Sequence, residues 1–221
     1  MKCLKLIFCL LYFCCSLAEA KEVQVDAQKE VDEMTGRLVT SYLEAKVDED
    51  IIAGYASALR SDGSFPDLDY VTVHEGSSYP AGSHLKRLKL MAIAYRKPGN
   101  KYYNSGRLLK QIVAGIDYWY RVRPKSGNWW FGDIGAPQDY MVPLILLKGK
   151  ISDKKLLHYS SYLQDLTGNK GHKGKNRTWV SAVTIHKGCI ENNIELIRIG
   201  IKSIASTITV SYTHLTLPTN S

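Results

Sequence analysis

One segment constrains the fold of this chain more than any other, because its apolar residues recur at the spacing of a helix. They fall at i, i+1, i+4, i+5, i+8, i+11 and i+12, and they are Leu108, Leu109, Ile112, Val113, Ile116, Trp119 and Tyr120. This spacing places them on one side of a long amphipathic helix, whose apolar face has to be buried against other elements. The segment therefore predicts a helix packed within a larger helical array.

The remaining chain repeats this pattern and carries almost no strand signal. Helices are predicted over residues 22–45, 48–60, 80–95, 137–147, 178–188 and 191–208, and another begins after Ser152-Asp153. Segments rich in turn formers separate them, namely Asp62-Gly-Ser-Phe-Pro-Asp67, Lys97-Pro-Gly-Asn100 and the Gly/Lys/Asn-rich residues 167–175. Roughly eight helices with short loops are typical of antiparallel helical hairpins, which build bundles and α/α toroids. The predicted fold class is all-α.

The first twenty residues have the pattern of an export signal. Lys2 and Lys5 precede an apolar run, and Ala18-Glu-Ala20 supplies the small residues of a cleavage site. The run is too short for a membrane span, so residues 1–20 are predicted to be a signal peptide of a secreted or periplasmic protein. Four of the five cysteines lie in this segment. The fifth, Cys189, has no partner for an internal disulfide and is predicted to be a small buried side chain.

The end of the chain differs from the rest. Residues 210–219 read Val-Ser-Tyr-Thr-His-Leu-Thr-Leu-Pro-Thr, which resembles, residue for residue, the translation of a transposase adapter used in sequencing libraries. Residues 210–221 are therefore predicted to be an artefact, and residues 21–209 form the predicted domain. The formal charge is +8. That charge suits nucleic acid, acidic polysaccharide or a membrane surface, and nucleic acid is the least natural partner of an exported protein.

Two clusters are candidates for binding. In Asn128-Trp129-Trp130, adjacent side chains on a helix point about 100° apart, so both indoles cannot easily face one core. Either an exposed indole stacks on sugar rings, or both rings fill a junction between helices. The second cluster is His172-Lys-Gly-Lys-Asn176-Arg-Thr-Trp179. There Asn176 could donate to a carboxylate at a helix start, or it is simply a helix cap, and residue pattern alone favours the cap.

Other kinds of site find little support in the sequence. The histidines show no metal-ligand spacing, and there is no glycine-rich phosphate loop and no nucleophile elbow, so no metal or cofactor is expected. Asp117 and Asp133 flank the tryptophans and leave open a pair of carboxylates for glycoside hydrolysis. A structural or solvated role is favoured for both.

Beyond these patterns, Asn128-Trp-Trp-Phe-Gly-Asp-Ile-Gly-Ala-Pro-Gln138 resembles the Asn-Trp-Trp…Ile-Gly-x-Pro-Gln signature of polysaccharide lyase family eight. Asp62-Gly-Ser-Phe-Pro-Asp67, His84-Leu-Lys-Arg87, residues 94–103 and Gly174-Lys-Asn176-Arg-Thr are similar to further family segments in the same order. The resemblance covers nearly all of residues 50–209. It implies an incomplete α/α toroid that cleaves uronic-acid-containing glycosaminoglycan, of the chondroitin or hyaluronan kind, by β-elimination.

The resemblance also assigns roles. Trp129 and Trp130 match the aromatic patch that stacks on sugars, Asn128 and Gln138 lie with them in the substrate-binding cleft, and Asn176 matches the catalytic asparagine at the uronate carboxylate. The family's tyrosine, histidine and arginine lie further along than this chain reaches, as do the C-terminal β-sandwich domains that help close the cleft. Two alternatives stay open, a non-catalytic acidic-polysaccharide-binding protein and an α/α-toroid glycoside hydrolase.

Overall fold

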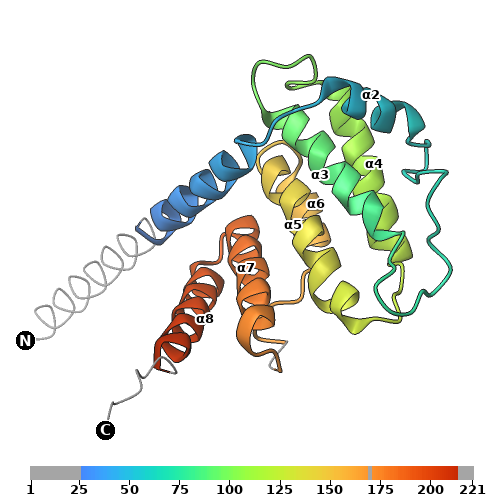
Figure 1. The fold of residues 1–221 in the computed structure, drawn as a ribbon. Coiled ribbons are helices and arrows are strands. Elements are labelled where there is room, and N and C mark those ends of the chain that lie inside the picture. Colours follow the sequence, from blue (N-terminus) through green and yellow to red (C-terminus); the bar gives the residue numbers. More distant parts are fainter. Residues whose placement is uncertain (1–25, 169–170, 214–221) are drawn as a thin grey trace, which may run out of the picture.

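The computed structural model describes residues 26–168 and 171–213, with side chains described to residue 207 (Figure 1). The predicted signal peptide lies outside these residues, as do residues 214–221 of the predicted adapter segment. Within the described ranges the chain forms helices and no strand. A first helix over residues 26–43 precedes α2 (Glu49–Ala58), α3 (Gly82–Arg96), α4 (Gly106–Val122), a π-helical turn η1 (Phe131–Gly135), α5 (Ala136–Leu147), α6 (Asp153–Ser160), α7 (Gly174–Glu191) and α8 (Ile194–Thr213).

The helices pair as hairpins, and the hairpins stand side by side. Helix α3 packs on α4, α5 on α6, and α7 on α8, while α3 contacts α5 and α5 contacts α7. Helices α3, α5 and α7 form one layer, and α4 and α6, which contact each other, pack on α3 and α5. This is the hairpin array of an α/α toroid, present as an incomplete arc. The predicted all-α fold is confirmed.

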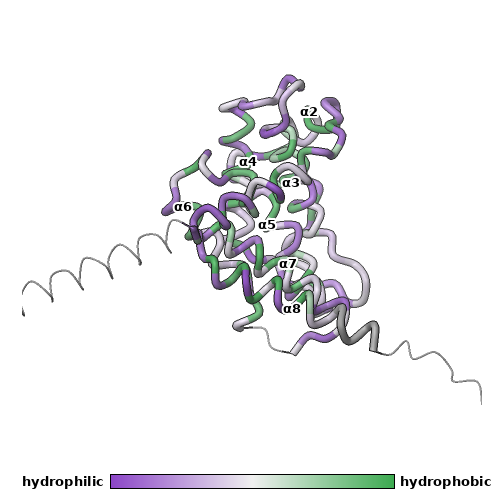
Figure 2. The backbone as a smooth tube through the Cα atoms, turned by 90° about the vertical axis from the view of Figure 1, so that its left-hand side faces the viewer, coloured by the Kyte–Doolittle hydropathy of each residue, from purple (hydrophilic) through white to green (hydrophobic). Residues whose placement is uncertain are grey.

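Helices α4 and α5 show how the distribution of apolar residues along a helix matches its position in the array. On α4, Leu108, Ile112, Ile116 and Trp119 are buried, as the helical spacing requires. Helix α5 is different, because ten of its twelve residues are buried. A helix that is apolar on every side has to be surrounded, and α5 is packed between α3, α6 and α7. Figure 2 shows that the other helices of the arc carry both hydrophobic and hydrophilic residues.

Helix α8 does not bury all of the isoleucines that recur along it at helical spacing. Ile197 is buried, but Ile201, four residues later, is 45% exposed. The packed face contains Gly200, where an added Cβ would lie 2.9 Å from the main-chain oxygen of Ser181. Helix α8 therefore approaches α7 through a small residue, and this close approach rotates Ile201 away from the contact. Cys189 is buried, as predicted.

A buried histidine fixes the long segment that leads into α3. The imidazole of His84 donates from Nε2 to the Gly115 carbonyl (2.9 Å) and accepts at Nδ1 from the Tyr70 hydroxyl (2.9 Å). The same hydroxyl accepts from the main-chain N–H of Phe65. At the predicted turn, Gly63 has a φ of +90°, and an added Cβ would lie 2.0 Å from the Ala114 carbonyl oxygen. Residues 60–79 are thereby held against α3 and α4.

No helix among the described residues has both the length and the apolar character that crossing a bilayer requires.

Candidate functional site

The first layer brings three helix beginnings to one end of the molecule. Because α4 and α6 return the chain, α3, α5 and α7 run in the same direction, and their N-terminal ends lie together at the lower end of the view in Figure 1. Tyr79 precedes α3, Trp130 precedes α5, and Trp179 lies near the start of α7. Helix N-termini carry partial positive charge, so this end of the layer favours anionic ligands.

The two adjacent tryptophans lie in different environments, as their spacing predicts. Trp129 is 53% exposed, and its indole is stacked on the His172 imidazole with centroids 5.3 Å apart and planes 16° apart. Trp130 is half-buried and contacts the Trp179 ring edge to face, at 5.5 Å and 77°. The pair therefore joins η1 to the start of α7. One tryptophan contributes an exposed aromatic surface, and the other anchors it.

A π-helical turn positions Trp130. In η1 the main-chain N–H of Ala136 donates to the carbonyl of Phe131, five residues earlier. This wider turn aims Phe131 at Tyr79, and the two rings stack at 5.1 Å and 30°. At Gly135 an added Cβ would lie 2.7 Å from the indole of Trp130. The turn can hold the indole against its own backbone only because position 135 lacks a side chain.

Asn128 holds the loop in place through its own side chain. Its Nδ2 donates to the Gly76 carbonyl (2.9 Å), and its Oδ1 accepts from the Trp130 main-chain N–H (3.0 Å). Both ends of the amide are therefore used within the protein. The resemblance implies a cleft-lining residue here, and the geometry shows a side chain that orients the tryptophan segment.

Asn176 is placed differently. Helix α7 begins at Gly174 with Lys173 as its N-cap residue, so Asn176 lies inside the first turn and the simple cap interpretation is wrong. Among the described residues, none forms a hydrogen bond with its half-buried amide. Trp179 follows three positions later, so both side chains lie on one side of the helix. The Lys175 ammonium lies 4.9 Å from the centre of the Trp179 ring. Amide, cation and aromatic surface thus meet at the start of α7.

His172 adds a further unpaired group. Its Nε2 is buried and has no hydrogen-bond partner within the described structure, while its ring covers Trp129. An unpaired buried nitrogen costs free energy unless a ligand or water supplies a partner. Among the described residues, His172 and Asn176 therefore both carry hydrogen-bonding groups without a partner, and the His172 ring lies against the exposed indole of Trp129.

A recess of about 150 Å³ lies beside Trp130 and is called the aromatic recess here. Its lining residues come from the starts of α3 and α5 and from η1, and they are Tyr79, Gly82, Lys86, Trp130, Phe131, Gly135, Ala136, Gln138 and Asp139. Gln138 therefore belongs to this recess. The Lys89 ammonium lies 3.7 Å from the Asp139 carboxylate, and burial raises the pKa of that carboxyl despite the nearby lysines.

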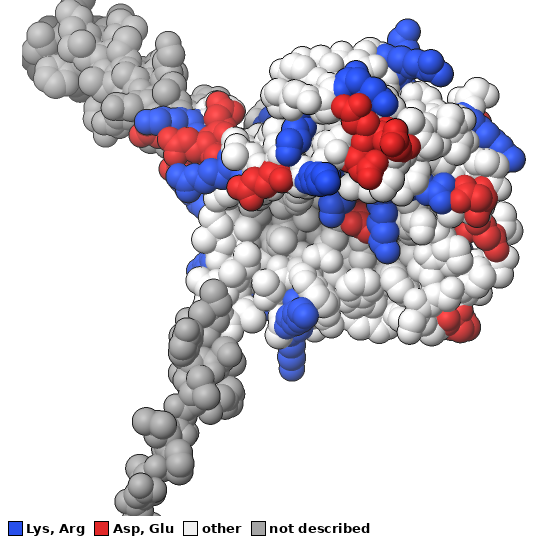
Figure 3. All heavy atoms as spheres, turned by 45° about the horizontal axis from the view of Figure 1, so that its top comes forward, with Lys and Arg blue, Asp and Glu red and all other residues white. Residues whose placement is uncertain are grey.

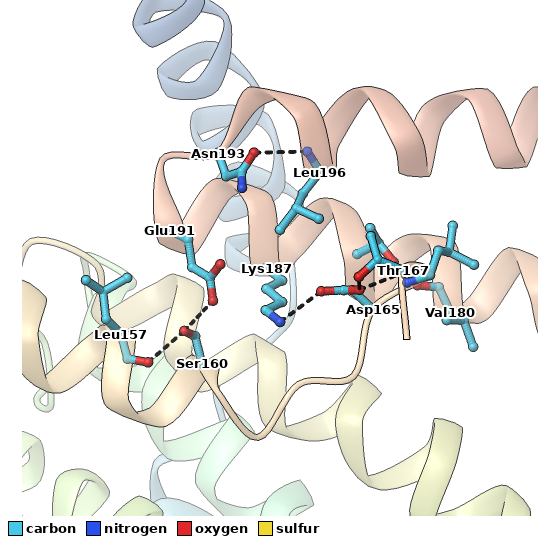
Figure 4. A network of polar contacts seen from close by, with 11 residues as sticks. Leu157, Ser160, Asp165, Thr167, Val180, Lys187, Glu191, Asn193 and Leu196 are labelled. Atoms are coloured by element: carbon cyan, nitrogen blue, oxygen red, sulfur yellow. Dashed lines mark hydrogen bonds and ion pairs between the residues drawn. The ribbon is translucent and has the colours of Figure 1, made fainter. Parts of the chain in front are cut away.

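The segment before α7 is clamped to the middle of that helix (Figure 4). The Asp165 carboxylate accepts from the main-chain N–H of Thr167 (2.8 Å) and from the Lys187 ammonium (2.9 Å). Both ionic side chains are largely buried, with 10% and 17% exposed. The Leu166 N–H donates to the Thr184 hydroxyl at 3.0 Å. These bonds fix where the chain leaves α6 and approaches the His172 loop.

The carboxylates considered for hydrolysis are not arranged as a pair. Asp117 accepts from the Lys155 ammonium (3.1 Å) and from the Tyr159 hydroxyl, so both of its oxygens serve a structural contact between α4 and α6. Asp133 lies in η1. The described part of the chain contains no group of three or more His, Cys, Asp or Glu side chains arranged to hold a metal ion.

On one face of the molecule, positive and negative side chains are interspersed. On the face that brings the end opposite the aromatic site forward, Lys and Arg alternate with Asp and Glu (Figure 3). Near the site, Lys173 and Lys175 belong to the loop and first turn of α7, and Arg177 donates to the Ser203 hydroxyl (2.8 Å). Lys173, Lys175 and the N-termini of the helices therefore supply positive charge at this end of the molecule.

Sequence reasoning missed part of the aromatic cluster. It did not select Tyr79 and Phe131, and it named Trp179 only as the end of the second cluster, without a role. The three-residue spacing between Asn176 and Trp179 on one helix was a usable signal for the latter. No local signal identifies Tyr79, because its contact with Phe131 depends on how α3 and α5 pack.

Comparison with known proteins identifies the family of this arrangement. The model of the polysaccharide lyase family 8 N-terminal alpha-helical domain matches residues 29–214. The chain belongs to this family. Chondroitinase-AC from Pedobacter heparinus is 27% identical over 150 residues, which are 67% of this chain and 21% of the relative. Hyaluronate lyase HylB from Enterococcus faecalis is 30% identical over 112 residues, covering 45% of this chain and 11% of the relative.

Solved structures show the same fold. A chondroitinase AC lyase studied in oligosaccharide complexes superposes with a TM-score of 0.71 at 22% identity. That match covers 79% of this chain and 26% of the solved chain. The chain therefore spans about a fifth of the length of the chondroitinase AC relative.

Proposed function

We propose that this chain is the polysaccharide-binding arc of a lyase that cleaves uronic-acid-containing glycosaminoglycan by β-elimination. The observation that carries the proposal is the exposed indole of Trp129, which stacks on His172 just before α7, together with the Asn176 amide in the first turn of α7, which has no hydrogen-bond partner among the described residues. An indole face binds the C–H surface of a sugar ring, while an amide beside a helix N-terminus suits a carboxylate. Relatives named for chondroitin and hyaluronate support this substrate class.

The chemistry explains why an amide is needed. β-Elimination removes the proton at C5 of a uronide, which is acidic only when the charge of the adjacent carboxylate is neutralised. Asn176 would donate to that carboxylate and stabilise the enolate-like charge that develops. A base then takes the proton and an acid protonates the leaving oxygen. In this proposal those groups are the family's later tyrosine, histidine and arginine, so the present chain binds without cleaving.

The protein would act outside the cell or in the periplasm, where the predicted export signal directs it and such polysaccharides are met. A hydrolase that uses Asp117 is disfavoured, because that carboxylate is engaged by Lys155 and Tyr159. A binding protein without lyase activity differs from the proposal only in lacking the later catalytic residues.

Binding of chondroitin and hyaluronan oligosaccharides to this chain tests the first half of the proposal. We expect Asn176→Asp, which keeps the shape but adds a negative charge, to weaken binding about tenfold or more. Asn193→Asp is the matched control, because Asn193 caps α8 through Leu196 and aspartate caps equally well. It should leave affinity nearly unchanged. Equal affinities for all three proteins would contradict the role of Asn176.

Cleavage tests the second half. The product of elimination carries a new C=C bond conjugated to the carboxylate, so it absorbs in the far ultraviolet. We expect this absorbance from the uninterrupted gene product and none from the present chain. Product formation by the present chain would overturn the assignment of the acid and base to later residues.

A further inference from the structure

Arg123, which follows the last residue of α4, has a backbone conformation that its residue type disfavours. Its φ is 47° and its ψ is 63°, in the left-handed region. Among the described residues, the other non-glycine residues with a positive φ are two asparagines, a residue type that tolerates this region. Pro124 comes next, and the residue before a proline normally takes an extended conformation. A strained arginine therefore lies at this bend, and strain of this kind is concentrated at functional sites.

Hydrogen bonds from α4 and from the segment before α3 hold the bend in this shape. The main-chain N–H of Arg123 donates to the Trp119 carbonyl (2.9 Å), and its side-chain Nε donates to the Tyr120 carbonyl (3.1 Å). The Tyr79 hydroxyl donates to the Pro124 carbonyl (2.9 Å). Tyr79 also lines the aromatic recess, so the bend adjoins the candidate site.

Two tyrosine rings hold the guanidinium of Arg123. Its central carbon lies 4.7 Å from the centre of the Tyr120 ring and 5.9 Å from the centre of the Tyr162 ring. The Tyr120 ring is itself fixed, because its hydroxyl shares a hydrogen bond with the Ser161 hydroxyl (2.8 Å) and the ring lies 4.3 Å from the His158 imidazole. A guanidinium that already rests on aromatic rings loses less freedom when it binds a ligand.

The outer edge of this guanidinium is available to a ligand. Within the described part of the chain, Nε forms the hydrogen bond to the Tyr120 carbonyl, and no carboxylate lies within ion-pair distance of Arg123. The terminal nitrogens Nη1 and Nη2 therefore keep their donors. A planar fork of this kind matches two oxygen atoms of one carboxylate or sulfate group. The geometry of the bend thus suits an oxyanion.

We infer that Arg123 binds one oxyanion of the polysaccharide, either a uronate carboxylate or a sulfate ester, beside the aromatic recess. Both groups present two oxygen atoms to the fork, and an acidic polysaccharide carries such groups at regular intervals. The inference rests on the proposed function and adds a second anion contact to it. Asn176 lies in the first turn of α7, whereas Arg123 lies between the C-terminal ends of α4 and α6.

Binding of chondroitin sulfate and hyaluronan oligosaccharides of equal length tests the inference. We expect Arg123→Gln, which removes the fork, to weaken binding about threefold or more at low salt. Weakening confined to chondroitin sulfate identifies a sulfate ester as the anion, and equal weakening for both polymers identifies the carboxylate. Either result supports the site. Unchanged affinity for both polymers would overturn it.

Arg121→Gln is the matched control, because it removes the same charge from a neighbouring position. Arg121 is also exposed and lies over a tyrosine, with its guanidinium 5.7 Å from the centre of the Tyr118 ring. It lies two positions before Arg123 and therefore on another side of the helix. This variant should bind nearly as the wild type does. A loss as large as that of Arg123→Gln would mean that general positive charge attracts the polymer, and the inference would fail.

Arg123→Gly separates binding from folding. Glycine adopts this φ without strain, so the urea midpoint should stay the same or rise while binding weakens as in Arg123→Gln. Wild-type affinity in Arg123→Gly would show that the residue only ends α4, whatever the midpoint.

The inference and the proposed function fail in different ways. Polymer binding that depends on Asn176 but not on Arg123 would remove the oxyanion site and leave the proposed function intact. Binding of inorganic sulfate that depends on Arg123, without any binding of polymer, would support the oxyanion site and contradict the proposed function.

Discussion

At the scale of single residues, a glycine controls where the central indole lies. Trp130 contacts Trp179, lines the aromatic recess and is held by Asn128 through its main-chain N–H. The first two relations require the indole to lie close to η1, where Gly135 leaves the space that it occupies. Trp130 is consequently the residue that contacts both the start of α7, through Trp179, and the aromatic recess.

Gly135→Ala should therefore displace Trp130. The added Cβ would lie 2.7 Å from the ring, so the indole or the turn has to move. We expect a loss of about 1–3 kcal/mol in the free energy of unfolding, with a shifted tryptophan emission spectrum. Gly132→Ala is the control in the same turn, because no atom lies within 4 Å of its added Cβ. Urea denaturation followed by fluorescence gives both readouts, and equal behaviour of the two variants would refute the steric role of Gly135.

At the scale of elements, the clamp between residues 165–167 and α7 holds the chain before the His172 loop. Lys187→Met would leave the Asp165 carboxylate largely buried without its cation (Figure 4). Breaking a buried pair from one side typically costs about 3–5 kcal/mol, and we expect a loss toward that range in the free energy of unfolding.

The double variant Asp165→Asn/Lys187→Met separates charge from packing. Asparagine keeps the oxygen that accepts from the Thr167 N–H but carries no charge. Most of the stability lost in Lys187→Met should return in the double variant, as measured by thermal and urea unfolding. If the double variant is no more stable than Lys187→Met, the ion pair is not what stabilises this segment.

How far the sequence predicts these elements depends on whether the signal is local. The spacing from Leu108 to Tyr120 predicts α4, because the period of a helix is visible in its own residues. The i→i+5 turn at Phe131–Gly135 has no comparable period, so it could not be separated from the start of α5. The start of α7 was predicted four residues late, since Gly174 and Lys175 resemble loop residues. They become helical in a structure where α7 packs on α8.

In the candidate site, too, features with a local sequence signal differ from features that depend on packing. Adjacency indicates that the two indoles cannot easily share one core but leaves open whether either is exposed, and in the structure Trp129 is exposed. The contact between Trp130 and Trp179 joins residues 49 positions apart and follows only from the parallel direction of α5 and α7. The role of Asn176 came from family resemblance, and it stays a prediction that the binding experiment tests.

At the scale of the whole molecule, two buried histidines connect different parts of the arc and make its stability depend on pH. His84 joins α3 to α4 and to Tyr70. His186 on α7 accepts from the Tyr42 hydroxyl of the first helix (2.8 Å) and donates to the Ala182 carbonyl (2.7 Å). Burial lowers the pKa of each imidazole to about 4, so both are neutral in the folded protein near pH 7.

These pKa values predict acid destabilisation in a defined window. In the unfolded chain a histidine titrates near pH 6.5, so between pH 6.5 and 4 the unfolded state binds more protons and stability falls as pH falls. We expect a loss of about 2 kcal/mol per histidine in the free energy of unfolding between pH 7 and pH 5. Asp139, whose pKa is raised, acts in the opposite direction but is a single carboxyl. His186→Gln keeps an amide for Tyr42 and Ala182 but cannot be protonated, so urea denaturation should show a smaller difference between the two pH values. A difference as large as that of the wild type would mean that the charge state of His186 does not contribute.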